Sequence, residues 1–332
     1  MPEEIISVQE LSKKYRVSTR KPGLKASLKG LIKKEFVEVN AVQNVSFSIQ
    51  PGEFVGFIGP NGAGKTTTLK MLSGLLHPTS GEVKVLGYIP WKRDKNYLSR
   101  ISMVLGNKSQ MLWDIPATDT FQVLAEIYRV PRKLYKDRID ELVELLVMED
   151  ILDKPVRNLS LGERMKCELT AGLIHQPDVM YLDEPTLGLD VTMQARLRKF
   201  LKTYNEMRGV TIILTSHYLT DVLTLCPRVI LIHKGDILYD GDLKKLAMQI
   251  APFKLIKIEF EDGSMIDTVD VQLSPGVEII DKSDANITIR VNRNEVSKIA
   301  SSLLNSLPIA DLSIENPPIE AVIDQVYQEG GL

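Results

Sequence analysis

The sequence has little of the chemistry from which disulfide frameworks and thiolate metal centres are built. It contains only two cysteines among 332 residues, Cys167 and Cys226, and their separation matches no metal-binding motif. A pair this sparse is typical of a reducing compartment, where thiols fill space in a core. We therefore expect two free thiols that are part of the packing.

Long hydrophobic runs are absent as well. No stretch approaches the ~18 consecutive apolar residues that cross a bilayer. The N-terminal segment MPEEIISVQE lacks the apolar core of a secretion signal. The sequence thus predicts a cytosolic protein that reaches a membrane only through a partner.

An excess of charge is missing too, because the formal net charge is -2. The whole chain therefore lacks the basicity of a general nucleic-acid-binding protein. Residues 13–34 are an exception, with nine basic residues and no acidic one. Within an insert of about residues 13–38, Leu24, Leu28 and Leu31 recur at helical spacing between lysines. Such a helix would lie on an anionic membrane surface or against a permease, or it would pack on the main domain as a solvated surface helix.

The length favours a large domain over 1–250 followed by a smaller one over 251–332. Apolar runs alternate with helical patterns up to about residue 226, which is typical of an α/β domain with a mainly parallel sheet. After Ala251-Pro252, short strands and two helices predict an α+β unit, for which a ferredoxin-like arrangement is one option. The elements expected in the first domain are strands at 4–8, 44–50, 53–58, 179–182 and 211–216, helices at 119–128, 137–148, 161–176, 191–207 and 218–225, and a hairpin around Lys234-Gly235-Asp236.

A glycine-rich segment, GPNGAGKT at 59–66, follows the apolar run EFVGFI and fits the pattern G-x-x-x-x-G-K-[ST]. Glycines let backbone N–H groups approach phosphate oxygens, and the helix that follows presents its positive end. Lys65 would neutralise phosphate charge and Thr66 would ligate Mg²⁺. A turn could match this pattern by chance, but its place between a buried strand and a helix favours a nucleotide site.

Two carboxylates end the apolar strand VMYLDEP at 179–185. Ligands of open α/β sheets bind at the carboxyl ends of strands, so Asp183 is expected to hold Mg²⁺, directly or through water. Glu184 faces another way and is a candidate general base for the attacking water. His217 ends the strand TIILTSH at the same edge, where it could donate a hydrogen bond to the γ-phosphate or the water. Solvated acids and a structural histidine are the alternatives, and the nearby phosphate loop disfavours them.

The segment LSLGER at 159–164 has two compatible interpretations. Ser160 and Glu163 have the spacing of a capping box at a helix start. A Ser-x-Gly sequence at such a start also offers a hydroxyl, free N–H groups and a dipole to a phosphate, and Gly162 allows close approach.

These segments together resemble the motifs of the ATP-binding subunits of ABC transporters. GPNGAGKTT is similar to the Walker A motif, VMYLDEP to Walker B, TLGLD at 186–190 to the D-loop, and Ser216-His217 to the switch histidine. LSLGE stands where the family has its LSGGQ signature, with Leu161 for the usual Gly and Glu163 for the usual Gln. The resemblance covers about residues 4–245. It implies a P-loop NTPase cassette with an antiparallel β subdomain and a helical subdomain at about 107–165.

The resemblance also assigns roles to single residues. It implies that Glu184 and His217 are catalytic, that Thr66 and Asp183 hold Mg²⁺, and that Tyr15 stacks on adenine. The residues implied to bind ATP are Tyr15, Gly59, Pro60, Asn61, Gly62, Ala63, Gly64, Lys65, Thr66 and Thr67, with Ser160, Gly162 and Glu163 from the signature.

In this family two cassettes hold each ATP between the phosphate loop of one and the signature of the other, so a second copy of the chain is the simplest partner. Closing and opening would drive a separate permease at the cytoplasmic face of a bacterial or archaeal membrane. LSLGERMK, the basic insert and the C-terminal unit are most similar to the ATPases of ABC-2 type permeases, including drug or viologen exporters.

Two other functions remain open. The first is a cytosolic ABC ATPase acting on ribosomes or DNA. Such proteins usually carry two fused cassettes or a long coiled coil between the Walker motifs, so we expect no nucleic-acid partner here. The second is an ATP-dependent sensor. The C-terminal unit shows no chemical motif, and we favour a role in bracing the dimer over ligand sensing.

The stretch MVLGNKSQMLWD at 103–114 occupies the place of the family's Q-loop, whose glutamine senses Mg²⁺ and whose far side meets the permease. Asn107 aligns with that glutamine, and Gln110 comes three residues later. We favour Gln110 as a Mg²⁺ ligand because its side chain is longer, with Asn107 acting through a water as the alternative. Leu112 and Trp113 would form an apolar contact for the permease, unless Trp113 packs on the helical subdomain.

Overall fold

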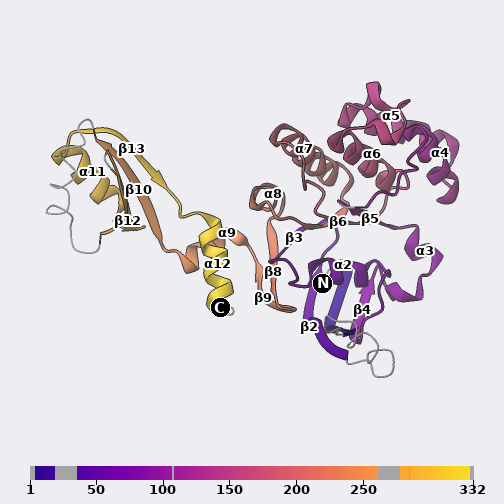
Figure 1. Cartoon of the computed structure of the whole chain (residues 1–332), viewed down its shortest axis with the longest axis horizontal. Helices are drawn as coiled ribbons and strands as arrows, with labels where there is room; N and C mark the ends of the chain where they lie inside the picture. The colour runs from indigo at the N-terminus through magenta and orange to yellow at the C-terminus, as the bar shows by residue number, and fades with distance from the viewer. Residues whose placement is uncertain (1–3, 19–35, 107, 261–276, 284, 330–332) are drawn as a thin grey trace, which may run out of the picture. The chain divides into compact units, whose positions relative to one another are not determined.

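The computed structural model describes residues 4–18, 36–106, 108–260, 277–283 and 285–329 (Figure 1). They form two compact units, Met1–Asp240 and Gly241–Leu332, and each is described by itself. The units divide ahead of the boundary expected at residue 250. Helix α9 (Leu243–Ile250) belongs to the second unit, where it packs against α12 (Ile319–Glu329).

A six-stranded sheet is the centre of the first unit. The pairings from β5 through β6, β7 and β3 to β8 are all parallel. Every residue of β3, β6 and β7 is buried, as expected for continuous apolar runs in a parallel sheet. The carboxyl ends of these three strands therefore meet at one edge. The order is β5 (Ile101–Leu105), β6 (Val179–Asp183), β7 (Thr211–Thr215), β3 (Phe54–Ile58), β8 (Arg228–His233) and β9 (Asp236–Gly241).

An antiparallel sheet forms a second layer against the parallel one. It has the order β2 (Phe36–Ile49), β1 (Ile6–Ser18) and β4 (Ser80–Val85). Its buried side chains, such as Ile6 and Val83, share one apolar core with Phe57 of the parallel sheet.

The strands β1 and β2 are much longer than the short strands expected at 4–8 and 44–50. Beyond the end of β4 they continue as a two-stranded ribbon, with Tyr15 opposite Val39 and Val17 opposite Val37. Cross-strand pairs of β-branched and aromatic residues stabilise such a ladder. The ends of the basic insert are thus strands, and the helix predicted around Leu24 to Ile32 lies outside the described residues.

Helices cover the parallel sheet, and their ends follow local sequence signals. At the start of α7 the Asp190 side chain accepts the N–H of Met193 at 2.9 Å, and the helix ends at Gly209 with φ +64°. Figure 1 shows α4, α5 and α6 gathered as a helical subdomain near β5 and β6. The helices are α2 (Lys65–Leu72), α3 (Lys95–Leu98), α4 (Ala117–Ile127), α5 (Arg132–Leu146), α6 (Leu161–Leu173), α7 (Val191–Arg208) and α8 (Leu219–Leu225), with 3₁₀ turns at Pro90–Lys92, Glu149–Ile151 and Val156–Asn158.

Cys167 and Cys226 are both free and buried, as predicted. Burial raises the pKa of the Cys167 thiol to about 12 and that of Cys226 well above its usual range. Both residues therefore act as small apolar side chains.

In its described residues, the second unit has a four-stranded antiparallel sheet with helix α11 packed on it. The order β11 (Glu278–Lys282), β12 (Asn286–Asn292), β10 (Phe253–Phe260) and β13 (Ile309–Glu315) places β12 between β10 and β11. This split order agrees with the ferredoxin-like option. Helix α11 (Val296–Ser306) packs Ile299 and Leu303 on Ile256 and Ile289.

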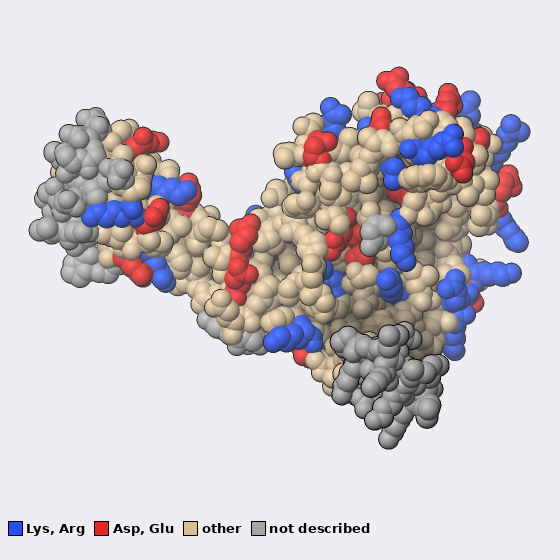
Figure 2. Space-filling view, in the orientation of Figure 1, with Lys and Arg blue, Asp and Glu red and all other residues tan. Residues whose placement is uncertain are grey.

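No helix in the described ranges combines the length and the apolarity needed to cross a bilayer. On the face shown in Figure 2, lysine and arginine side chains lie interspersed with aspartate and glutamate over α4, α5 and α6.

Candidate nucleotide-binding site

The glycine-rich loop leaves β3 and enters α2 through a backbone that only glycine adopts easily. Gly64 precedes the helix with φ +112°, and a Cβ atom there would lie 2.5 Å from the carbonyl oxygen of Ala41. Gly62 has φ +80° with open space around it, and Pro60 and Asn61 are exposed. The loop thus presents accessible backbone in front of a helix N-terminus, the arrangement that binds phosphate.

Lys65 lies folded back over this loop. Its side chain is 5% exposed, and Nζ donates to the carbonyl oxygens of Gly59 at 2.5 Å and Pro60 at 3.3 Å. Burial lowers the pKa of Lys65, while the negative charges of Glu184 and Asp183 act in the opposite direction. The ammonium is therefore held at the loop, where phosphate oxygens would be better acceptors than the two carbonyls.

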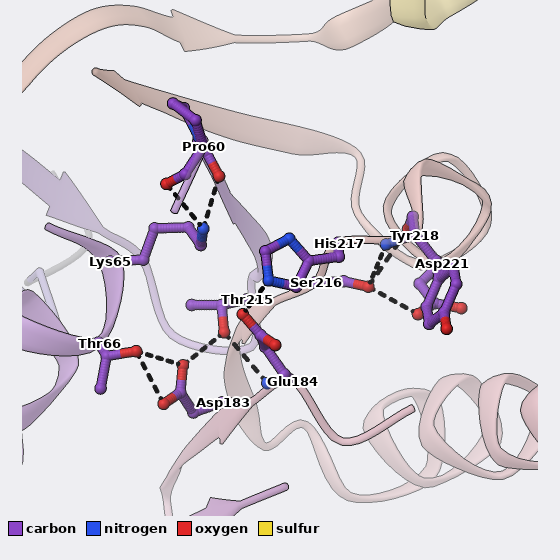
Figure 3. A network of polar contacts seen from close by, with 11 residues as sticks. Pro60, Lys65, Thr66, Asp183, Glu184, Thr215, Ser216, His217, Tyr218 and Asp221 are labelled. Atoms are coloured by element: carbon purple, nitrogen blue, oxygen red, sulfur yellow. Dashed lines mark hydrogen bonds and ion pairs between the residues drawn. The ribbon is translucent and has the colours of Figure 1, made fainter. Parts of the chain in front are cut away.

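Thr66, Asp183 and Thr215 form an oxygen-rich cluster beside the loop (Figure 3). The hydroxyl of Thr66 lies 3.0 Å and 2.9 Å from Oδ1 and Oδ2 of Asp183, and the hydroxyl of Thr215 donates to Oδ1 at 2.7 Å. Within the described part of the chain, no three His, Cys, Asp or Glu residues gather as a metal cluster. A hydroxyl with one carboxylate is nonetheless the donor set of a Mg²⁺ ion that takes its other ligands from phosphates and water. Thr66 and Asp183 therefore fit Mg²⁺.

Glu184 points away from Asp183 and towards His217 (Figure 3). Its Oε1 lies 2.7 Å from Nε2 of His217. The backbone of Glu184 is left-handed, with φ +55°, and its N–H donates to both oxygens of Thr215, O at 3.0 Å and Oγ1 at 3.1 Å. Such a conformation in a non-glycine residue is typical of functional sites, because the surrounding bonds must hold it.

A pocket of about 120 Å³ opens beside these side chains. The phosphate-loop helix contributes Lys70 as well as Thr66, and the segment after β5 contributes Lys108. Sequence reasoning missed both lysines, because Lys70 belongs to no motif and Lys108 lies among the Q-loop residues without being its amide. The pocket is lined by Thr66, Lys70, Leu105, Lys108, Asp183, Glu184 and Leu187.

Sequence reasoning also missed a buried node at Asp221. This side chain is 0% exposed and accepts bonds from Thr186 (2.5 Å), Ser216 (2.8 Å) and Arg198 (2.6 Å). It thereby ties the segment after Glu184 and helix α7 to the segment that carries His217. Only the tertiary fold reveals this role, because the sequence around Asp221 predicts an exposed acid on a short helix.

The capping box of the signature segment is formed. The N–H of Ser160 donates to Oε2 of Glu163 at 2.8 Å, and the N–H of Glu163 donates to Oγ of Ser160 at 3.3 Å. The first of these bonds lowers the pKa of Glu163. Ser160 is exposed at the start of α6. Tyr15 is 36% exposed on β1, with Nζ of Lys13 5.4 Å from its ring centroid.

The loop after β5 differs from expectation. The side-chain amide of Gln110 donates to the carbonyl oxygen of Glu168 at 3.0 Å, so it lies on helix α6 and not beside Thr66 and Asp183. The Gln110 side chain takes this position because the backbone carbonyl oxygen of Glu168 on α6 accepts its hydrogen bond. Asn107 lies outside the described residues.

Trp113 partly fits both interpretations proposed for it. Its side chain remains 48% exposed, and Leu112 beside it is 47% exposed. The guanidinium of Arg164 lies 4.4 Å from the ring centroid of Trp113, so one face of the indole packs on the helical subdomain.

Comparison with known proteins agrees with this geometry. Residues 42–187 match the ABC transporter family model, and residues 252–315 match the model of the EvrA-like ABC transporter C-terminal domain. A solved structure of an ATP-binding subunit of an ABC transporter aligns with a TM-score of 0.61 and 22% identity, covering 74% of this chain and 92% of that chain. That likeness shows the shared fold.

Two relatives from Bacillus subtilis (strain 168) extend the comparison. The linearmycin resistance ATP-binding protein LnrL is 26% identical over 294 residues, which are 87% of this chain and 94% of the relative. The ABC transporter ATP-binding protein NatA is 36% identical over 208 residues, which are 63% of this chain and 84% of the relative. A match of this identity over most of NatA shows that the chain belongs to the ABC transporter ATP-binding proteins, which bind and hydrolyse ATP.

Proposed function

We propose that this chain pairs with a second cassette, most simply a copy of itself, closes on two ATP molecules and drives a separate ABC-2 type permease as an exporter. One observation carries the pairing. Among the described residues that line the pocket beside Thr66, Asp183 and Glu184, none comes from the signature segment at 159–164. Ser160 is nevertheless exposed at a helix start, which suits a phosphate held by another chain.

The chemistry we propose at the pocket is hydrolysis by an activated water. Glu184 acts as the general base, and Nε2 of His217 orients its carboxylate. Lys65 and the loop N–H groups hold the phosphates in line. Mg²⁺, held by Thr66 and Asp183, would neutralise charge that develops on the phosphate oxygens.

An export role is supported by the relative named for linearmycin resistance, which matches over nearly its whole length. The EvrA-like C-terminal match supports a subtype with an accessory unit. We further propose that the chain works at the cytoplasmic face of a bacterial or archaeal membrane. Leu112 and Trp113 would provide the apolar contact with the permease, because both are half exposed beside the helical subdomain.

The C-terminal unit is proposed to brace the dimer. It offers one packed core and a sheet whose other face carries ion pairs, such as Lys257 with Glu315 at 2.7 Å. Charged pairs of this kind suit a solvated surface more than a ligand cavity. Ligand sensing is therefore the second choice for this unit.

The function is tested by co-expressing the chain with a candidate ABC-2 type permease from the same genome. We expect the two to purify as a complex from detergent-solubilised membranes and the ATPase rate to change when the export substrate is added. Sedimentation of the chain with ribosomes or DNA, with no membrane complex, would instead establish the cytosolic alternative. A nucleic-acid footprint is a basic patch, whereas the face of the helical subdomain shown in Figure 2 carries interspersed charges.

A further inference from the structure

The loop after β5 is held at both of its ends. At its start, the N–H of Gly106 donates to the carbonyl oxygen of Asp183 at 2.8 Å. A Cβ atom at Gly106 would lie 2.2 Å from the carbonyl oxygen of Glu184, so only glycine fits. The loop therefore begins in direct contact with the two carboxylate residues of the nucleotide site.

The other end of the loop is bound to Glu168 of helix α6. The Glu168 carboxylate accepts the hydroxyl of Ser109, and both of its oxygens lie 3.2 Å from the N–H of Gln110. The side chain of Gln110 donates to the Glu168 carbonyl oxygen at 3.0 Å. Met111 completes the turn, because its N–H donates to the Ser109 hydroxyl at 3.1 Å.

The carboxylate that makes these bonds is itself buried. Glu168 is 4% exposed, although it lies on the same helix as the exposed signature serine. Burial raises the pKa of Glu168, and the bonds from Ser109 and Gln110 oppose that shift. A buried acceptor of this kind is costly unless its partners are in place, so the loop and the helix stabilise one arrangement of each other.

A second contact joins the same helix face to the same loop. Arg164 stands one helical turn before Glu168, and residues four apart lie on one side of a helix. Its guanidinium packs on Trp113, at the permease-facing end proposed above. The loop thus connects the ends of β5 and β6 to the helix that begins with the signature.

We propose that Glu168 is a positioning residue that fastens the loop 108–113 to the signature helix α6 through Ser109 and Gln110, so that the loop and Ser160 move together when ATP binds. The inference deepens the proposed function and rests on it for the dimer measurement below. Glu168 is not among the residues that line the pocket beside Thr66 and Asp183. Its effect passes through the loop and the helix.

The experiment compares four variants of the full chain. Glu168→Leu removes the carboxylate, and Glu168→Gln keeps an acceptor oxygen for the Gln110 N–H. Ser109→Ala removes the loop side of the contact at an exposed position, so folding is not threatened. Lys166→Met is the matched control, because Lys166 is 7% exposed on the same helix and donates to the Val147 carbonyl oxygen, away from the loop.

Three measurements are made on each variant. Hydrogen exchange at the backbone N–H of Gln110 reports its bond to the Glu168 carboxylate directly. This measurement needs no transport activity. ATP-driven dimerisation, followed with a Glu184→Gln background that blocks turnover, reports the position of the signature. Nucleotide affinity of the monomer is measured alongside, since the phosphate loop makes none of these contacts.

We expect Glu168→Leu to speed exchange at Gln110 by about ten- to a hundredfold, the worth of a lost bond to a charged group. The ATP concentration for half-maximal dimerisation should rise at least ~10-fold by the same reasoning, with monomer affinity unchanged. Ser109→Ala should shift both in the same direction by less, and Glu168→Gln should largely restore them.

Unchanged exchange in Glu168→Leu and Ser109→Ala would overturn the proposal. So would a dimerisation defect that Lys166→Met reproduces, because the cause would then be general loss of packing in the helical subdomain. A wild-type chain that never dimerises in ATP would contradict the proposed function instead. The exchange data alone would then decide whether Glu168 holds the loop 108–113 on α6.

Discussion

Nε2 of His217 lies 2.7 Å from Oε1 of Glu184, and this bond joins the ends of two different strands of the parallel sheet. Glu184 follows β6, whereas His217 follows β7. The left-handed backbone of Glu184 turns its carboxylate away from Asp183 and towards the histidine. Two neighbouring acids in the sequence therefore take separate tasks, one beside Thr66 and the other beside His217.

Replacing Glu184 with Gln should lower kcat for ATP hydrolysis by ~10²-fold or more, the usual worth of a general base. The amide keeps the shape of the side chain, so ATP should still bind and trap the dimer. Turnover and size-exclusion chromatography in ATP and Mg²⁺ measure the two effects. Full ATPase activity in this variant would rule out the role we assign.

Replacing His217 with Ala should lower kcat at least ~10-fold, because the Glu184 carboxylate loses its partner. The effects of His217→Ala and Glu184→Gln should not add in the double variant, since residues in contact act as a unit. His77→Ala is a suitable control, because His77 contacts Trp91 outside the nucleotide site. Additive effects of the two site variants would show that the residues act independently.

Replacing Asp183 with Asn should raise the Mg²⁺ concentration needed for half-maximal activity by about 10- to 100-fold. Gln110→Ala should leave that concentration unchanged, because the Gln110 amide is bound to α6. A Mg²⁺ titration of ATPase rate at saturating ATP separates the two. An equal rise of the half-maximal Mg²⁺ concentration in both variants would show that Gln110 is a Mg²⁺ ligand after all.

Replacing Asp221 with Ala should lower the free energy of unfolding of the first unit by about 3–5 kcal/mol, because it leaves the buried Arg198 charge unpaired. Urea unfolding of Asp221→Ala and of the wild-type chain measures this loss of free energy. Asp178→Ala is the matched control, since its pair with Arg100 is about half exposed and exposed pairs contribute roughly 0–1 kcal/mol. Equal losses of unfolding free energy in both variants would show that the buried bonds of Asp221 add no special stability.

Deleting Gly241–Leu332 should weaken ATP-driven dimerisation more than it weakens nucleotide binding. The cut belongs at residue 240 because α9 packs on α12, and a cut at 251 would expose the buried Leu246 of α9. Analytical ultracentrifugation in ATP, with a fluorescent nucleotide titration of the same sample, provides the comparison. A truncated chain that dimerises as tightly as the full chain would remove the bracing role.

Much of the site could be predicted from local sequence. The phosphate loop, Asp183, Glu184 and His217 all follow buried apolar strands, and parallel strands bring their carboxyl ends to one edge whatever the loops do. The capping box at Ser160 was predictable because it depends on residues three positions apart. The β ribbon at Tyr15 was not, since its strands gain their length only from cross-strand pairs with Val37 and Val39.

What the sequence by itself determined is therefore the chemistry that short-range pattern and strand order dictate: a nucleotide loop, two carboxylates and a histidine at one sheet edge. Only the tertiary structure decided which polar groups pair across the fold. It bound Gln110 to α6 and joined Asp221 to Arg198, across separations that carry no sequence period. The physical reason is that a buried carboxylate must find partners, and packing, not local pattern, determines which donors lie within reach.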